Sequence, residues 1–178
     1  DLGENILTIE ADELFQRVKA TVGQEAVFTA PEELGRSSFR KYALAVEDSN
    51  PIYTNYQFAR SLGLHDIVAP PTLICDSFHY YGTDIDEDGY PVGSRQESPD
   101  FPWRAGNDYE FFQHISPEDV ITMRRIVKDV WQKPSRSGSL VFQQIEVSYQ
   151  NQHGNLLARN VELLFYKPAG QSRKNESG

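Results

Sequence analysis

The stretch that decides the fold is LVFQQIEVSYQ (140–150), followed by NQHGN (151–155) and LLARNVELLFYK (156–167). Apolar side chains alternate in both longer segments: Ile145, Val147, Tyr149, Val161, Leu163 and Phe165. A period of two residues is typical of β-strands, since successive side chains point to opposite faces. The five residues between the segments include Gly154. We therefore predict an antiparallel hairpin.

Three further segments upstream of the hairpin have strand character. We predict strands over 24–30, which Pro31 closes, over 107–112, and over 120–131 after the turn 116–119. Pro168 ends the last strand of the chain, because proline lacks the N–H that a sheet ladder needs.

Two helices are predicted in the first half of the chain. Over 36–47, Phe39, Tyr42, Ala43 and Val46 form one apolar stripe at helical spacing, with Ser37 or Ser38 as the cap. The helix ends at the turn-forming residues 48–51. A second short helix spans about 55–62 and ends at Gly63.

Two more helices complete the pattern. A short amphipathic helix near the N-terminus has Asp12 as its predicted cap. A mostly apolar, buried helix is predicted over 71–80, because Pro71 is well tolerated in a first helical turn. The segment 83–105 that follows is rich in Gly, Pro and Asp, a composition typical of a functional lid or mobile loop.

These elements predict an α+β fold in which an antiparallel sheet wraps around the apolar helix. The expected domains are an N-terminal extension with a short helix (1–24), one globular domain (25–168) and a disordered polar tail (169–178).

Composition excludes several function classes. The formal net charge of −9 argues against a nucleic-acid partner, which would need a basic surface. No segment is apolar over enough residues to span a membrane, and no secretory signal is visible, so a cytoplasmic location is expected. Cys75 is the only cysteine and is interpreted as a small apolar core residue. No metal site is predicted.

Three segments together resemble one known family. They are FRKYALAVEDSNPIY (39–53), IVAPPT (67–72) and NDYEFF (107–112), followed by SPED (116–119) and NQHG (151–154). Their order is similar to that of MaoC-like dehydratases and (R)-specific enoyl-CoA hydratases, in the branch resembling the dehydratase N-terminal domain of fatty-acid synthases. The resemblance covers roughly residues 25–167. It implies the hotdog fold, an antiparallel sheet around a long central helix.

Family members add water reversibly to the double bond of an enoyl thioester of coenzyme A or an acyl carrier protein, without a further cofactor. The resemblance places the catalytic positions at Asp48, Asn50 and Tyr53, where active members resemble Asp-x-Asn-Pro-hydrophobic-His. Here Tyr53 stands at the histidine position. A phenol has a reference pKa of about 10 and is a poor base near neutrality.

A second departure lies at the start of the central helix. Active members have a His-Gly or similar pair there, and the glycine N–H stabilises the developing oxyanion. Pro70 and Pro71 stand at that pair, and Pro71 has no N–H. Losing such a donor costs about 3–4 kcal/mol of transition-state stabilisation. The resemblance makes Ala69, Pro70, Pro71 and Thr72 substrate-binding positions.

The two departures suggest the substrate-binding half of a hydratase or dehydratase. Such a half pairs with a catalytic hotdog chain in a heterodimer or heterotetramer, or else forms a homodimer, and the segment 83–105 would enlarge or cover its acyl pocket. The acyl chain stays open among fatty, branched, sterol-derived and polyketide-like groups.

Other interpretations of the same residues stay open. One is a self-sufficient hydratase that uses Asp48, Tyr53 and the Thr72 N–H. Another is an acyl-CoA thioesterase, since hotdog folds also host that chemistry. A third is an acyl-CoA-binding module without turnover. Asp48 is equally consistent with a simple helix-ending Asx turn.

Overall fold

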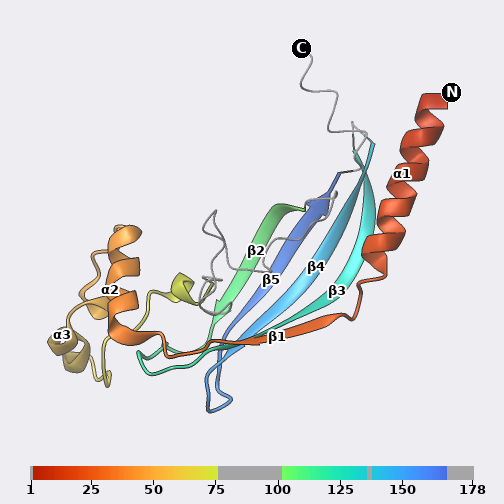
Figure 1. Ribbon diagram of the computed structural model, residues 1–178. Helices are drawn as coiled ribbons and strands as arrows, with labels where there is room; N and C mark the ends of the chain where they lie inside the picture. The colour runs from red at the N-terminus through yellow and green to blue at the C-terminus, as the bar shows by residue number, and fades with distance from the viewer. Residues whose placement is uncertain (1, 76–101, 136–137, 168–178) are drawn as a thin grey trace, which may run out of the picture.

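The computed structural model describes residues 2–75, 102–135 and 138–167. It contains three α-helices, two short 3₁₀ helices and five strands within these ranges (Figure 1). In chain order they are α1 (Leu2–Lys19), β1 (Glu25–Thr29), α2 (Gly35–Ala45), η1 (Pro51–Tyr53), α3 (Tyr56–Ser61), η2 (Pro71–Cys75), β2 (Trp103–Phe111), β3 (Thr122–Ser135), β4 (Gly138–Gln150) and β5 (Leu156–Tyr166).

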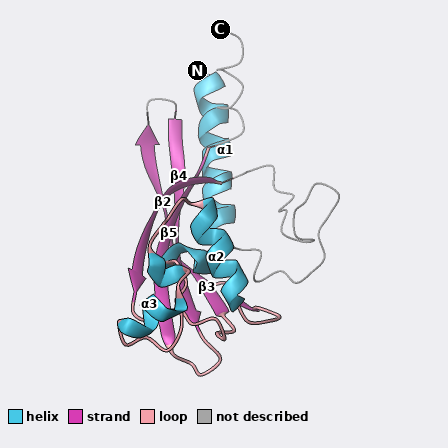
Figure 2. Ribbon diagram, turned by 90° about the vertical axis from the view of Figure 1, so that its left-hand side faces the viewer, coloured by secondary structure: helices cyan, strands magenta, loops and turns pink. Residues whose placement is uncertain are grey.

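The five strands form a single antiparallel sheet in the order β1-β3-β4-β5-β2. β1 and β2 are therefore its two edges, far apart in space. The α+β class predicted from the sequence is confirmed. Helix α1 runs alongside β3 and β4, and α2 and α3 gather near one end of the strands (Figure 1 and Figure 2).

The hairpin between β4 and β5 is present as predicted. The Asn151 side-chain oxygen accepts hydrogen bonds from the N–H groups of His153 and Asn155, both at 3.1 Å. Gly154 has φ 77°, a conformation that disfavours residues with a Cβ. The turn residues thus carry their own hydrogen-bonding pattern and fix the register of the two strands.

Burial along β4 alternates strictly and identifies the inner face of the sheet. Its buried side chains are Val141, Gln143, Ile145, Val147 and Tyr149. On β5 the alternating apolar side chains face outward: Val161, Leu163 and Phe165 pair with Glu146, Gln144 and Phe142, which are on the outer face. The inner positions of β5 are Asn160, Glu162, Leu164 and Tyr166.

An aromatic row crosses the outer face over four strands. Its successive ring centroids lie 5.7, 6.1 and 6.4 Å apart, in the order Trp131, Phe142, Phe165, Trp103. Lys133 lies over Phe142 and Lys167 over Trp103, both at 5.5 Å from the ring centroid. Offset aromatic pairs and cations over their faces stabilise this outer face of the sheet.

Helix α1 is longer than predicted and begins ahead of Asp12, so the predicted cap is wrong. The predicted amphipathic character is confirmed: Leu14 and Val18 are buried in the core. Gln143 donates to the Thr21 hydroxyl at 2.9 Å, and Lys19 to the Val130 carbonyl at 3.0 Å. Helix α1, which lies in the segment predicted as an N-terminal extension, thus packs against β3 and β4.

Helix α2 matches its predicted position and buries Phe39 and Ala43, but its start differs from expectation. Leu34 occupies the cap position and neither Ser37 nor Ser38 caps the helix, so that prediction is wrong. The helix start is held instead by long-range bonds, since the Gly35 N–H donates to the Pro117 carbonyl at 2.8 Å. α3 is capped by Asn55, and Gly63 follows it with φ 84°.

The predicted central helix differs in its described part. Residues 71–75 form the 3₁₀ helix η2, not the start of an α-helix, and Leu73 N–H donates to the Pro70 carbonyl at 3.0 Å. Residues 76–80 of that prediction lie outside the described residues. The same holds for 83–101 of the predicted lid, whereas Trp103–Ala105 belong to β2 and not to a loop.

Candidate functional site

In the loop after α2, the side chains of Asp48 and Asn50 each accept a hydrogen bond from the backbone N–H two residues further on. The Asp48 carboxylate accepts the Asn50 N–H at 3.0 Å, and the Asn50 oxygen accepts the Ile52 N–H at 3.1 Å. Asn50 is thereby the N-cap of η1, with Pro51 at the first helical position. Glu47, just before, has φ 57°. The Asp48 and Asn50 side chains are exposed, and each uses one oxygen to accept a backbone N–H of the turn.

Tyr53, at the end of η1, is half-buried. Burial raises the pKa of its phenol, and the nearby negative charge of Asp48 raises this pKa further. The shift is opposite to the one a general base would need, because the phenol is held protonated at neutral pH. Tyr53 can donate a hydrogen bond beside Asp48, but it does not replace an imidazole as a proton acceptor.

The segment 66–72 contains the second stretch of the resemblance and is hydrogen-bonded on both sides, to η1 and to the chain that follows β2. The Val68 N–H donates to the Ile52 carbonyl at 3.2 Å, on the side of η1. The Ala69 N–H donates to the Ile115 carbonyl at 3.0 Å, on the side of the chain that leaves β2. Residues separated by more than 60 positions in sequence thus meet in one place.

The four predicted substrate-binding residues at the start of η2 differ in their exposure to solvent. Ala69 and Pro70 are buried, whereas Pro71 and Thr72 are exposed. The Thr72 hydroxyl accepts a hydrogen bond from the Tyr42 hydroxyl at 3.0 Å, which ties η2 to α2. Pro71 supplies no N–H, and within the described residues the Thr72 N–H has no bonded acceptor.

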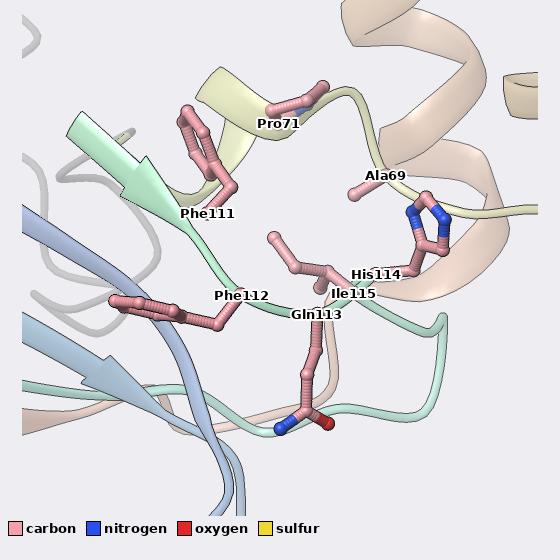
Figure 3. Close-up of a pocket in the computed structure, with 7 residues that line it drawn as sticks. All are labelled: Ala69, Pro71, Phe111, Phe112, Gln113, His114 and Ile115. Carbon is pink, nitrogen blue, oxygen red and sulfur yellow. The ribbon is translucent and has the colours of Figure 1, made fainter.

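A hollow of about 220 Å³ lies between η2 and the end of β2 (Figure 3). Its lining residues are Ala69, Pro71, Phe111, Phe112, Gln113, His114 and Ile115. Two of the four predicted substrate-binding residues, Ala69 and Pro71, line it. Pro70, Thr72 and the three predicted catalytic residues are not among the lining residues.

His114 is a residue of this hollow that the sequence did not single out. Its ring lies beside Ala69 in Figure 3. An isolated histidine without a partner at a recognisable spacing carries no motif. Only the backbone bond between Ala69 and Ile115 brings His114 to the start of η2.

The ion pair of Arg36 and Asp66, which the sequence did not indicate, anchors the segment that leads into η2. Arg36 Nε donates to the Asp66 carboxylate at 2.9 Å, and the Ile67 N–H donates to it at 2.7 Å. Asp66 is buried, and the hydrogen bond with Arg36 holds the pKa of its carboxyl below the usual range. The pair connects the first turn of α2 to the segment that leads into η2.

The described residues contain neither a metal-binding cluster nor a membrane-spanning helix. No group of three or more His, Cys, Asp and Glu side chains in these ranges is arranged to hold a metal ion. None of the helices in the described part of the chain is long and apolar enough to cross a bilayer.

The antiparallel sheet with α1 packed against β3 and β4 is the hotdog fold of MaoC-like dehydratases and (R)-hydratases, as predicted. Residues 20–160 match the model of the FAS1-like dehydratase domain region, and the chain belongs to this family. A UPF0336 protein of Streptomyces coelicolor is 45% identical over 125 residues, which cover 62% of this chain and 83% of that protein.

Solved structures share the fold at low identity. The ChsH1–ChsH2 complex from Mycobacterium tuberculosis superposes with a TM-score of 0.68 at 20% identity, over 92% of this chain and 94% of that one. The (R)-hydratase from A. caviae involved in PHA biosynthesis gives 0.58 at 17% identity, over 80% and 94%. The HadBC (3R-hydroxyacyl-ACP dehydratase) complex from M. tuberculosis gives 0.56 at 17% identity, over 82% and 98%.

Proposed function

We propose that this chain is the substrate-binding half of an enoyl-thioester hydratase or 3-hydroxyacyl-thioester dehydratase and needs a catalytic hotdog partner. The observation that carries the proposal is the loss of two catalytic groups at positions that the family resemblance names. Pro71 has no N–H for an oxyanion, and the Tyr53 phenol has a pKa shifted upward, away from base function. Its family is one of hydro-lyases.

The expected ligand is an acyl thioester of coenzyme A or an acyl carrier protein. The hollow beside η2 has an apolar wall of Ala69, Pro71, Phe111 and Phe112, which suits part of an acyl chain. His114, another of its lining residues, adds a polar group. Neither a cofactor nor a metal enters the proposal, because the acid and base would come from the partner.

The partner is expected along the edge strand β2. Within the described residues, the outer edge of β2 has no neighbouring strand. Large apolar side chains are exposed on it and just after it, at Trp103, Phe111 and Phe112. Exposed apolar groups beside an unpaired strand favour a protein partner. The ChsH1–ChsH2 and HadBC structures are themselves complexes of two named chains.

The test is to purify the chain alone and together with its candidate partner, and to assay hydration of crotonyl-CoA and longer enoyl-CoA substrates. The proposal expects turnover only from the complex. Full activity of the isolated chain would contradict it.

The second candidate is a self-sufficient hydratase. Two features favour it: Asp48 lies near Tyr53, and the Thr72 N–H has no acceptor among the described residues. The carboxylate could then act as base and the amide as oxyanion donor. In that case, activity of the isolated chain would depend on the Asp48 carboxylate.

A further inference from the structure

The inner face of β5 buries an amide that the described residues do not satisfy. Asn160 is 3% exposed and points inward, opposite Val147. Its Nδ2 donates to the Asn107 oxygen at 2.9 Å, while its Oδ1 has no hydrogen-bond partner in the described part of the chain. A buried unpaired polar atom costs about 1–3 kcal/mol, so it calls for an explanation.

A second buried amide on the same face shows that the fold can satisfy such a group. Gln143 is 6% exposed, its Nε2 donates to the Thr21 hydroxyl at 2.9 Å, and its Oε1 accepts from the Tyr166 hydroxyl at 2.9 Å. Asn160 lacks the equivalent second partner. Its oxygen needs a donor, and if the amide were rotated its N–H would need an acceptor. A hydroxyl group satisfies either arrangement.

Asn160 lies on a line of inner-face residues that begins at the hollow. Phe111 lines the hollow, and its ring stacks on Tyr109 at 5.8 Å. Tyr109 is directly opposite Asn160, and Asn107 follows two residues further along β2. Four residues of strand from Phe111 to Asn107 span about 13 Å. An acyl chain seated at Phe111 and extended along β2 would therefore reach the Asn107–Asn160 pair.

The surroundings of this line favour a neutral group on the ligand. At the far end, Glu162 pairs with Arg104 at 2.8 Å, so both charges are already balanced. Near the hollow, the Tyr109 hydroxyl is hydrogen-bonded with Cys75 at the end of η2, and burial raises the pKa of this phenol. The Asn160 and Asn107 side chains, which would bind the ligand, are neutral amides.

We propose that Asn160, oriented by Asn107, binds a hydroxyl group on the acyl chain of the substrate, at a distance from the thioester set by β2. The inference rests on the proposed function, because it assigns a substrate class to the same acyl site. The substrate is then a hydroxylated acyl thioester, not a plain hydrocarbon chain.

The experiment compares decanoyl-CoA with its ω-hydroxylated counterpart by isothermal titration calorimetry on the full chain, alone and with its hotdog partner. A decanoyl chain is comparable in length to the line from Phe111 to Asn107. One satisfied buried hydrogen bond should make the hydroxylated thioester bind roughly threefold to tenfold more tightly. In Asn160→Leu this ratio should fall to about one, with decanoyl-CoA binding retained.

Gln143→Leu is the matched control. It removes another buried amide from the same face, but one that already has both partners, so the preference for the hydroxylated thioester should persist. Should Asn160→Leu not fold, Asn107→Ala at an exposed position tests the same pair, since Asn160 loses its orienting contact and the preference should weaken.

The outcomes separate the two levels of the proposal. Equal binding of both thioesters by the unmodified chain, or a preference that Asn160→Leu retains, overturns the hydroxyl site and leaves the acyl site standing. No binding of either thioester by the chain or its complex overturns the proposed function and the hydroxyl site together.

Discussion

The guanidinium of Arg36, in the first turn of α2, clamps the buried carboxylate of Asp66, 30 residues further along the chain. The same carboxylate accepts the Ile67 N–H at 2.7 Å. Because Val68 and Ala69 follow at once and pair with η1 and with the end of β2, this contact positions the whole candidate site.

Replacing Asp66 with Ala is expected to lower the free energy of unfolding by about 2 kcal/mol, because a buried Ile67 N–H and the guanidinium lose their acceptor. Urea denaturation checks this value. Glu25→Ala removes the carboxylate of an exposed pair with Arg124 and serves as control, with stability unchanged within error.

Asp66 also predicts a pH dependence. Its pKa is lowered in the folded state, so the unfolded chain binds the proton more readily. The stabilisation by the ionised group is complete above about pH 4 and is lost as pH falls through the folded pKa. Asp66→Asn should flatten the unfolding profile in this acidic range. An equally steep profile in the variant would assign the acid sensitivity elsewhere.

Asp48→Asn separates the two candidate functions. The amide oxygen can still accept the Asn50 N–H, so the turn survives while the carboxylate is lost. If the partner supplies the base, the complex should hydrate enoyl-CoA at a rate within about twofold of the unmodified complex. A loss of about a hundredfold or more, the usual weight of a general base, would support the self-sufficient enzyme.

The edge of the sheet gives a test of partner binding. Phe112 is 49% exposed beside β2, and Val27 is 56% exposed on the opposite edge strand β1. Phe112→Lys should weaken association with the hotdog partner by about tenfold or more, since it places a charge in an apolar interface. Val27→Lys should leave the affinity unchanged. Analytical ultracentrifugation of the two variants with the partner measures both.

The outer aromatic row predicts a stability effect remote from the site. Phe142 lies between Trp131 at 5.7 Å and Phe165 at 6.1 Å, with Lys133 over its ring. Phe142→Ala should cost about 2 kcal/mol of unfolding free energy without changing thioester affinity. Calorimetry and ligand titration on the same sample check both parts. A change in affinity would show that the outer face communicates with the site.

The features that local sequence could predict are those whose cause is local. The hairpin turn follows from Asn151 and Gly154, which satisfy the turn with their own side chain and backbone. The stripe of α2 follows from the spacing of Phe39 and Ala43. The loop of Asp48 follows from residues within two positions of each other.

The family resemblance also predicted residues of the site, because the three segments carry characteristic residues although they are far apart in the sequence. It indicated that Ala69 and Pro71 belong to one place, and both line the hollow. It could not indicate His114, which has no motif around it. The cap of α2 was predicted at a serine because the bonds from Leu34 and Gly35 to the 117–119 turn are invisible in local sequence.

The sequence by itself determined the strands, the turns, the family and the two departures at Tyr53 and Pro71, since each depends on residue type at a short spacing. Only the tertiary structure decided which face of β5 is inside. Alternation allows either choice, and a register shift of one residue exchanges all side chains between faces. Pairing with β4 resolved it, turning Phe165 outward and burying Asn160.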